Sequence, residues 1–213
     1  MLEACGPVAG KRILEIGFGN GDLARILDRL GGNVTAFDMV STKISKLREE
    51  APNVAWWHDD IATWKNPRHA DPYDLIVARD SFQFVEFNSA VERYLEVLGD
   101  AGRLDILVPN SDCPAVRRLE SHPREPFTGI SSNSLTHRLA KLGIGCDIAY
   151  RGIFLEENSV LGPYQSTPWQ FFGHPTRVHA PHFASMSTLV PHRIQVVFVK
   201  QPQATDGTIE PRE

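Results

Sequence analysis

The sequence predicts one α/β domain with a mainly parallel sheet, and three observations carry this prediction. The chain has 213 residues, which is enough for one domain with a substantial core. Short apolar runs alternate with stretches in which apolar residues recur at helical spacing, the pattern of strands connected by helices. A glycine-rich turn, GFGNG at residues 17–21, joins the first such strand to the first helix, as in sheets that bind ligands at their strand ends.

The N-terminal half is expected to begin with two strand–helix units. A helix over residues 22–30 follows the first strand, because apolar residues recur at helical spacing until Gly31 and Gly32 end it. The next helix is expected to reach residue 50, with Ser41 or Thr42 as its N-terminal cap. The expected strands of this half are the short apolar runs 12–16, 34–37, 54–57 and 73–78.

The C-terminal half continues the alternation, with helices expected over 86–98 and 131–142 and strands over 102–108, 146–155 and 193–200. Together the elements make a single domain over residues 1–200. A segment at about 156–192 interrupts it, in place of the short turn of an ordinary hairpin. The tail 201–213 is polar and contains proline and glycine, so we expect it to be disordered.

Charge and composition exclude several classes of partner. The formal net charge is −4, so the chain lacks the basic surface that a phosphate backbone requires, and we expect no nucleic-acid partner. The sequence has neither a run of eighteen apolar residues nor a signal-peptide pattern, which predicts no membrane partner and a cytoplasmic location. Its three cysteines are widely spaced and indicate neither a disulfide framework nor a thiolate metal site.

The glycine-rich turn is the strongest functional signal. Gly17, Gly19 and Gly21 lie where a strand turns into a helix, so the backbone can approach a ligand closely and the helix N-terminus offers unpaired amides. The spacing departs from the Gly-x-Gly-x-x-Gly of dinucleotide-binding turns, because Asp22 occupies the position of the third glycine. This disfavours a pyrophosphate ligand and leaves packing alone as the other explanation of the glycines.

Two carboxylates flank this turn. Glu15 stands two residues before Gly17, where it can engage the ammonium group of an amino-acid ligand directly or through water. Asp38 is expected at the end of the second strand, where its two oxygens can accept both hydroxyls of a ribose. Of the two obvious ligands for such a turn, a nicotinamide dinucleotide and S-adenosylmethionine, the sequence therefore favours the second.

With these residues the chain resembles the class I S-adenosylmethionine-dependent methyltransferases. The family pattern acidic-x-Gly-x-Gly-x-Gly is matched in full by EIGFGNG, and the resemblance covers about residues 11–155 and the last strand. It implies a Rossmann-like, doubly wound sheet of seven mostly parallel strands with an antiparallel last strand, and S-adenosylmethionine as cofactor. One departure is Ala101-Gly102 before the fifth strand, where relatives often have two glycines.

The resemblance also implies where the cofactor binds. Asp38 would hold the ribose, and Met39 would pack on the adenine. Asp60, or else Asp59, would lie near the adenine amino group, with Ile61 beside the ring. The full set of implied cofactor contacts is Glu15, Gly17, Phe18, Gly19, Gly21, Asp38, Met39, Asp59, Asp60, Ile61 and Arg79.

The end of the fourth strand, in YDLIVARDSFQFV, resembles the stretch that passes under the methionine part of the cofactor in this family. Arg79 and Asp80 are therefore implied contacts there, and an ion pair between these two residues is the alternative. Asp80 is in addition a candidate catalytic residue, and Gln83 is a candidate substrate contact.

The segment 156–192 is predicted to be a lid. It is rich in aromatic residues, and no Asp or Glu occurs from residue 158 to residue 193, which favours a packed, cationic cover over a disordered tract. Such a cover would exclude water from the reaction, either from this chain or as a second subunit's copy in a homodimer. Its candidate substrate contacts are Trp169, His174 and Arg177, and its candidate general bases are His179 and His182.

The histidines of this segment have two other interpretations. Surface or packing roles account for many histidines. A metal site is not expected, because no carboxylate or cysteine accompanies the three histidines and their spacing is not helical.

The sequence as a whole predicts an S-adenosylmethionine-dependent methyltransferase that acts at oxygen or nitrogen of a small polar or anionic molecule. The alternative is a protein of the same fold that binds S-adenosylmethionine without methylating, as a recruited cyclase or partner subunit. An oxidoreductase is disfavoured by the glycine spacing and by the lack of a Tyr-x-x-x-Lys pair. A nucleic-acid methyltransferase is disfavoured because the fourth strand lacks an Asn/Asp-Pro-Pro-aromatic motif.

Overall fold

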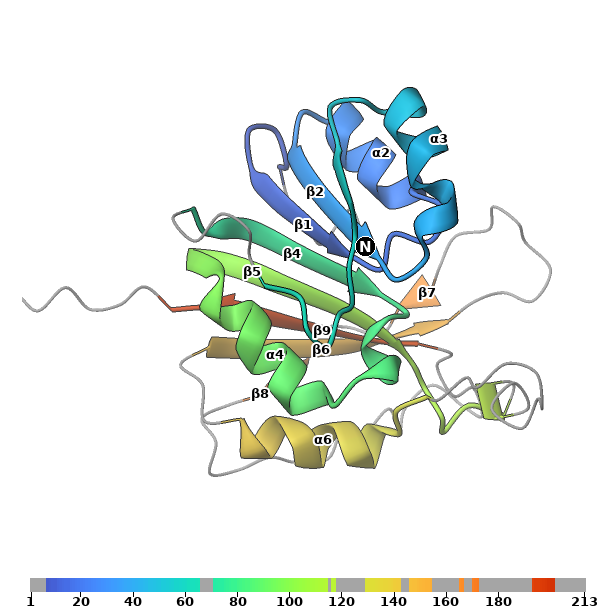
Figure 1. Cartoon of the computed structure of the whole chain (residues 1–213). Coiled ribbons are helices and arrows are strands. Elements are labelled where there is room, and N and C mark those ends of the chain that lie inside the picture. Colours follow the sequence, from blue (N-terminus) through green and yellow to red (C-terminus); the bar gives the residue numbers. More distant parts are fainter. Residues whose placement is uncertain are drawn as a thin grey trace, which may run out of the picture.

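The structure is a computed structural model, and it describes residues 7–65, 71–114, 116–117, 129–142, 146–154, 165–166, 170–172 and 193–201. A twisted central sheet runs through these residues, and helices pack on both of its faces (Figure 1). This is the layered arrangement expected of strands that alternate with helices along the chain.

Seven principal strands build the sheet: β1 (Arg12–Ile16), β2 (Asn33–Asp38), β3 (Ala55–His58), β4 (Tyr73–Arg79), β5 (Leu98–Pro109), β6 (Cys146–Phe154) and β9 (Arg193–Lys200). Their order is β3-β2-β1-β4-β5-β9-β6. The pairs among β1 to β5 are parallel, whereas β9 is antiparallel to both of its neighbours. The predicted seven-stranded, mostly parallel sheet with an antiparallel last strand is confirmed.

Helical crossovers make the connections from β1 to β2, from β2 to β3 and from β4 to β5, as parallel strands require long connections. The connection from β1 to β2 is α2 (Asp22–Arg29), and that from β2 to β3 is the 3-10 turn η1 (Ser41–Lys43) followed by α3 (Ile44–Glu50). Between β4 and β5 lie the 3-10 turn η2 (Phe82–Phe84) and α4 (Phe87–Glu96), and α6 (Ser132–Lys141) precedes β6.

The two faces of the sheet are both buried, because successive apolar residues of β1 and β4 point to opposite sides. Ile13 and Leu75 belong to the cluster that packs under α2 and α3. Leu14 and Ile76 belong to the larger cluster under α4 and α6, which also holds Tyr94. With both faces covered, the strand ends are the part of the sheet that a ligand can reach.

The predicted N-terminal cap of the second helix is wrong. Ser41 and Thr42 lie within η1, and neither η1 nor α3 has a side-chain cap. The physical reason is Asp38, whose Oδ1 accepts the Val40 amide at 2.9 Å and so turns the chain before the helix begins.

The insertion adds two short strands to the edge of the sheet. β7 (Gln165–Ser166) and β8 (Gln170–Phe172) each pair with β6 in the antiparallel sense. Within 156–192 the described residues are these five, and the tail beyond Gln201 also lies outside the described residues. The lid and the disordered tail therefore stay predictions.

Among the helices that the structure describes, none has the length and apolar character needed to cross a membrane. The described residues also contain no group of three or more His, Cys, Asp or Glu placed to hold a metal ion. The cytoplasmic location and the homodimer remain predictions.

Candidate functional site

The predicted cofactor residues meet at one edge of the sheet. β1, β2, β3 and β4 are neighbours and mutually parallel, so their carboxyl ends lie at the same edge. The loop of residues 17–21 follows β1, Asp38 ends β2, Asp59 follows β3, and Asp80 follows β4. Four segments that are far apart in the sequence thus contribute to one place.

The loop of residues 17–21, called the glycine loop below, packs on one side and is open on the other. Gly17, Gly19 and Gly21 have φ of 73°, 56° and 75°, the left-handed region that favours glycine. A Cβ atom added to Gly17 would lie 2.9 Å from the Cβ of Ser81, whereas one added to Gly19 would meet nothing within 4 Å. The open face at Gly19 is where a ligand can approach the backbone.

Phe18 contributes to this loop through its backbone. Its side chain is buried in the core and meets the Trp56 ring edge to face, with 5.1 Å between ring centroids. This contact anchors the loop to β3, which explains why an aromatic residue stands between two glycines.

Asp38 joins the glycine loop to the turn after β2. Its Oδ2 accepts the Gly19 amide at 2.8 Å, and its Oδ1 accepts the Val40 amide. An ionised carboxylate has about four acceptor positions, so both oxygens can still accept ligand donors. Met39 is 59% exposed beside it.

Glu15 is a buried carboxyl beneath the glycine loop. It is 2% exposed, and its Oε2 has no hydrogen-bond partner among the described residues. Burial raises its pKa to about 8, although Arg79 and the Ala24 amide act in the opposite direction. A cation brought near this group would favour its ionised form.

The turn after β3 is hydrogen-bonded to the turn after β2. The Asp59 amide donates to the Asp38 carbonyl at 3.1 Å, and His58 Nε2 lies 2.9 Å from the Met39 carbonyl oxygen. The carboxylates of this turn also have local partners: Asp59 Oδ1 accepts the Asp60 amide, and Asp60 Oδ1 accepts the Ala62 amide. Ile61 is 5% exposed and belongs to the larger core cluster.

Asp80 is paired with a residue that the sequence analysis did not place in the site. Arg193, the first residue of β9, donates from Nε to Asp80 Oδ1 at 2.8 Å and from Nη2 to Oδ2 at 3.4 Å. The partner of Asp80 is therefore Arg193 and not the neighbouring Arg79, whose side chain is exposed. Gln83 donates from Nε2 to the Asp80 carbonyl at 2.7 Å, which orders the turn after β4.

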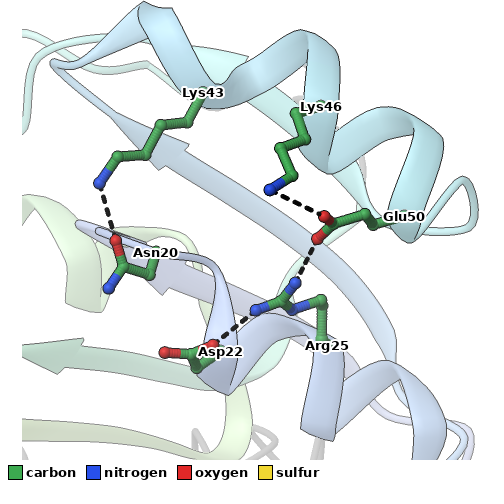
Figure 2. A network of polar contacts seen from close by, with 6 residues as sticks. All are labelled: Asn20, Asp22, Arg25, Lys43, Lys46 and Glu50. Carbon is green, nitrogen blue, oxygen red and sulfur yellow. Dashed lines mark hydrogen bonds and ion pairs between the residues drawn. The ribbon is translucent and has the colours of Figure 1, made fainter.

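A polar network supports the outer side of the glycine loop (Figure 2). Lys43 Nζ donates to Asn20 Oδ1 at 2.7 Å, and Arg25 bridges Asp22 and Glu50. Each exposed ion pair contributes little by itself, but together they connect the start of α2 to α3. The contact between Lys43 and Asn20 was not predicted, because no pattern in the sequence indicates that a lysine of the second crossover pairs with the asparagine of the glycine loop.

The candidate residues of the insertion lie outside the described residues. These residues are Trp169, His174, Arg177, His179 and His182. The described part of the site is therefore the donor side that the resemblance implies.

The comparisons with known proteins agree with this geometry. Residues 13–102 match the model of a family described as a methyltransferase domain. No curated protein matches the sequence significantly. Many solved structures share the fold, and three of them are described below.

A methyltransferase from Thermotoga maritima, described as S-adenosylmethionine-dependent and a possible histamine N-methyltransferase, has 15% identity and a TM-score of 0.61, with 90% of this chain and 82% of that chain covered. An S-adenosylmethionine-dependent methyltransferase from Mesorhizobium loti has 16% identity and a TM-score of 0.60, with coverage of 93% and 95%.

The third structure is magnesium protoporphyrin IX methyltransferase from Synechocystis PCC 6803 with bound S-adenosylhomocysteine, with 14% identity, a TM-score of 0.61, and coverage of 94% and 78%. At these identities the structures establish the fold, and the family model covers the glycine loop and the ends of β2 to β4. Residues 13–102 therefore match a methyltransferase-domain family, and the described residues have the fold of these S-adenosylmethionine-dependent methyltransferases.

Proposed function

We propose that the chain binds S-adenosylmethionine at this edge of the sheet and transfers its methyl group to a small polar or anionic molecule. The observation that carries the proposal is the open face of the glycine loop at Gly19, beside the carboxyl groups of Asp38 and Glu15. A ligand with a ribose at one end and an ammonium group at the other matches this arrangement.

The nucleoside end would lie toward β2 and β3. Asp38 would accept the ribose hydroxyls with the lone pairs that the Gly19 and Val40 amides leave free. The exposed Met39 would pack on the adenine, and the Asp59 turn, hydrogen-bonded to the Asp38 carbonyl, would border it.

The amino-acid end would lie toward β1 and β4. Glu15 lacks a partner at Oε2, and burial disfavours its charge. The donor carries a cationic ammonium and a cationic sulfonium, and either would stabilise the ionised carboxyl, as Arg79 does in part.

Bound S-adenosylmethionine would supply an activated methyl group on a sulfonium. In the transfer, the carbon–sulfur bond breaks with its electron pair going to sulfur as the bond from the methyl carbon to the acceptor forms, and the acceptor's proton passes to a base. The protein must align donor and acceptor, exclude water and hold that proton. Because both Asp80 oxygens accept from Arg193, His179 and His182 are the better candidates for the base.

The acceptor class rests on the sequence of the insertion. Residues 158–193 contain no Asp or Glu but contain Arg177, Arg193 and four histidines, which favours a polar or anionic acceptor. The structures of similar fold carry names that refer to chemically different acceptors, a possible histamine N-methyltransferase and a magnesium protoporphyrin IX methyltransferase, so the acceptor is not inferred from them.

The first test is ligand binding by calorimetry. We expect the wild-type protein to bind S-adenosylmethionine and S-adenosylhomocysteine and not to bind NAD, because the glycine loop lacks the dinucleotide spacing. Binding of NAD with none of either sulfur ligand would overturn the proposal. Sulfur-ligand binding without methyl transfer to any acceptor would instead favour the non-methylating alternative.

A second test concerns the base. With an acceptor in hand, His182→Ala is expected to lower turnover about 100-fold while changing S-adenosylhomocysteine affinity less than about twofold, since general-base catalysis contributes at least that much. His137→Ala is the matched control, because His137 is an exposed residue of α6. Equal turnover in the two variants would remove His182 from the reaction.

A further inference from the structure

The ion pair between Arg193 and Asp80 joins the last strand to the end of β4. The two residues are 113 positions apart in the sequence, and their side chains are 17% and 34% exposed. Two parallel hydrogen bonds from one guanidinium to one carboxylate fix direction as well as distance. Such a pair is stronger than an ordinary surface ion pair.

Asp80 adopts a backbone conformation that needs support. Its φ is 52°, a left-handed value that residues with a side chain rarely adopt, and such conformations persist where several contacts determine them. The Asp80 amide donates to the Leu107 carbonyl of β5 at 2.9 Å, and its carbonyl accepts from Gln83. The side-chain pair with Arg193 is the third restraint.

The next residue, Ser81, contacts the glycine loop. Ser81 is 8% exposed, and its hydroxyl donates to the Ile16 carbonyl at 2.9 Å. Ser81 Cβ is also the atom that a side chain on Gly17 would meet at 2.9 Å. The position of the turn after β4 therefore determines where the glycine loop begins.

We infer that Arg193 is a positioning residue for the donor site: through Asp80 it holds the turn that places Ser81 against the glycine loop. The inference rests on the proposed function, since it concerns affinity for the donor. Arg193 is also the residue at which the chain re-enters the sheet after the predicted lid.

The inference predicts a selective loss of affinity. Asp80→Asn removes the charge but keeps a residue that tolerates the left-handed conformation, and Arg193→Gln removes the guanidinium. Each is expected to weaken S-adenosylhomocysteine binding about tenfold, within the usual range of coupling between sites. The double variant should lose no more than Arg193→Gln alone, because that single variant already breaks the pair with Asp80. Arg193→Lys should retain part of the affinity.

Adenosine serves as the second probe. It lacks the amino-acid end, and the nucleoside end is assigned to β2 and β3, on the other side of β1 from the Asp80 turn. Its affinity is therefore expected to be unchanged in all of these variants. A general loss of structure would instead lower the affinity for both S-adenosylhomocysteine and adenosine.

Arg151→Gln is the matched control. Arg151 lies on β6, next to β9, and its Nε donates to Gln195 Oε1 at 2.8 Å. This variant is expected to lower the melting temperature without changing S-adenosylhomocysteine affinity. Thermal unfolding of every variant, measured alongside calorimetry, separates stability from binding.

Two results would overturn the inference alone: unchanged S-adenosylhomocysteine affinity in Asp80→Asn and Arg193→Lys, or equal losses for S-adenosylhomocysteine and adenosine. Failure of the wild-type protein to bind S-adenosylhomocysteine would overturn the proposed function as well. If Arg193→Gln does not fold, Asp80→Asn and Arg193→Lys decide the question.

Discussion

Replacing Gly19 by leucine is expected to reduce S-adenosylhomocysteine affinity by at least about 100-fold while leaving a folded protein. The added side chain would start where nothing lies within 4 Å, on the open face of the glycine loop. In the proposed complex that space belongs to the ligand, and the Gly19 amide and the Asp38 carboxylate meet at its edge. A bulky side chain there excludes the ligand sterically.

The substitution also has a backbone cost that must be separated from the effect on binding. A residue with a Cβ atom at φ 56° is less stable by about 1–2 kcal/mol. Gly10→Leu has the same cost, because Gly10 has φ of 74° and likewise meets nothing within 4 Å. Gly10 lies in the turn before β1, at the opposite end of that strand from the glycine loop.

Calorimetry with S-adenosylhomocysteine, together with urea unfolding, compares the two variants. We expect similar losses of unfolding free energy and a loss of binding in Gly19→Leu only. Equal affinities in Gly19→Leu and Gly10→Leu would mean that the open face is not the ligand site. Gly17→Leu is unsuitable for this test, because its side chain would collide with Ser81 and disturb the fold itself.

Local patterns were sufficient to predict most of the fold, including the edge of the sheet at which the candidate cofactor residues meet. The bounds of β1 and β9 agree with the predicted strands, because each is an apolar run with polar or glycine residues at its ends. The strand ends then follow from parallel pairing, which brings residues 17–21, Asp38, Asp59 and Asp80 to one edge without any knowledge of side-chain contacts.

Contacts between distant residues left no such pattern. Nothing near Asp80 in the sequence indicates that Arg193 pairs with it, and Ser81 gives no sign that it supports Gly17. β7 and β8 have two and three residues, which is too short for a period-two signal. The cap at Ser41 or Thr42 failed because Asp38 takes the Val40 amide first.

The burial of Glu15 makes the stability of the protein depend on pH. The sequence predicted a carboxylate before the glycine loop, but its burial comes from β2, α2 and β4 packing around it, with Asp38, Asp22 and Arg79 as the nearby charges. In the folded protein its pKa is about 8, against an ordinary value of 4.5. The native state therefore keeps this proton at pH values where the unfolded chain has lost it.

Glu15→Gln is expected to change the pH dependence of stability. Because the folded pKa is raised, the unfolded chain binds fewer protons than the native state between pH 4.5 and 8, and wild-type stability falls as pH rises through that window. A shift from 4.5 to about 8 corresponds to about 5 kcal/mol above pH 8. The glutamine variant lacks this loss, so its stability relative to wild type should rise by about 4 kcal/mol between pH 5 and pH 9.

The glutamine amide itself destabilises the native state, because no described residue is hydrogen-bonded at the position of Oε2. This destabilisation is the same at all pH values, so the quantity to compare is the change in stability with pH. Urea unfolding at pH 5, 7 and 9 gives the comparison, and a constant difference across the three would show that Glu15 does not hold a proton in the native state.

Glu86→Gln is a control of opposite sign. The Glu86 carboxylate caps α4 by accepting the Asn88 and Ser89 amides, which lowers its pKa. Because its pKa is lowered in the folded protein, Glu86 stabilises the native state at pH values above 4.5, and this stabilisation is lost as the pH falls through the lowered pKa. Glu86→Gln should therefore be less stable than wild type at neutral pH. The stability of Glu15→Gln relative to wild type should instead increase as the pH rises.

The same Glu15 variant also connects stability to the proposed function. If the ionised carboxyl holds the cationic end of the donor, glutamine should weaken S-adenosylmethionine binding at neutral pH, where the donor's ammonium group is charged. Binding to the wild-type protein at pH 7 should then release a proton, seen as a calorimetric heat that varies with the buffer's ionisation enthalpy. Equal proton release by wild type and Glu15→Gln would assign the proton to another group, and the buried carboxyl would be a cost to the fold without a part in binding the donor.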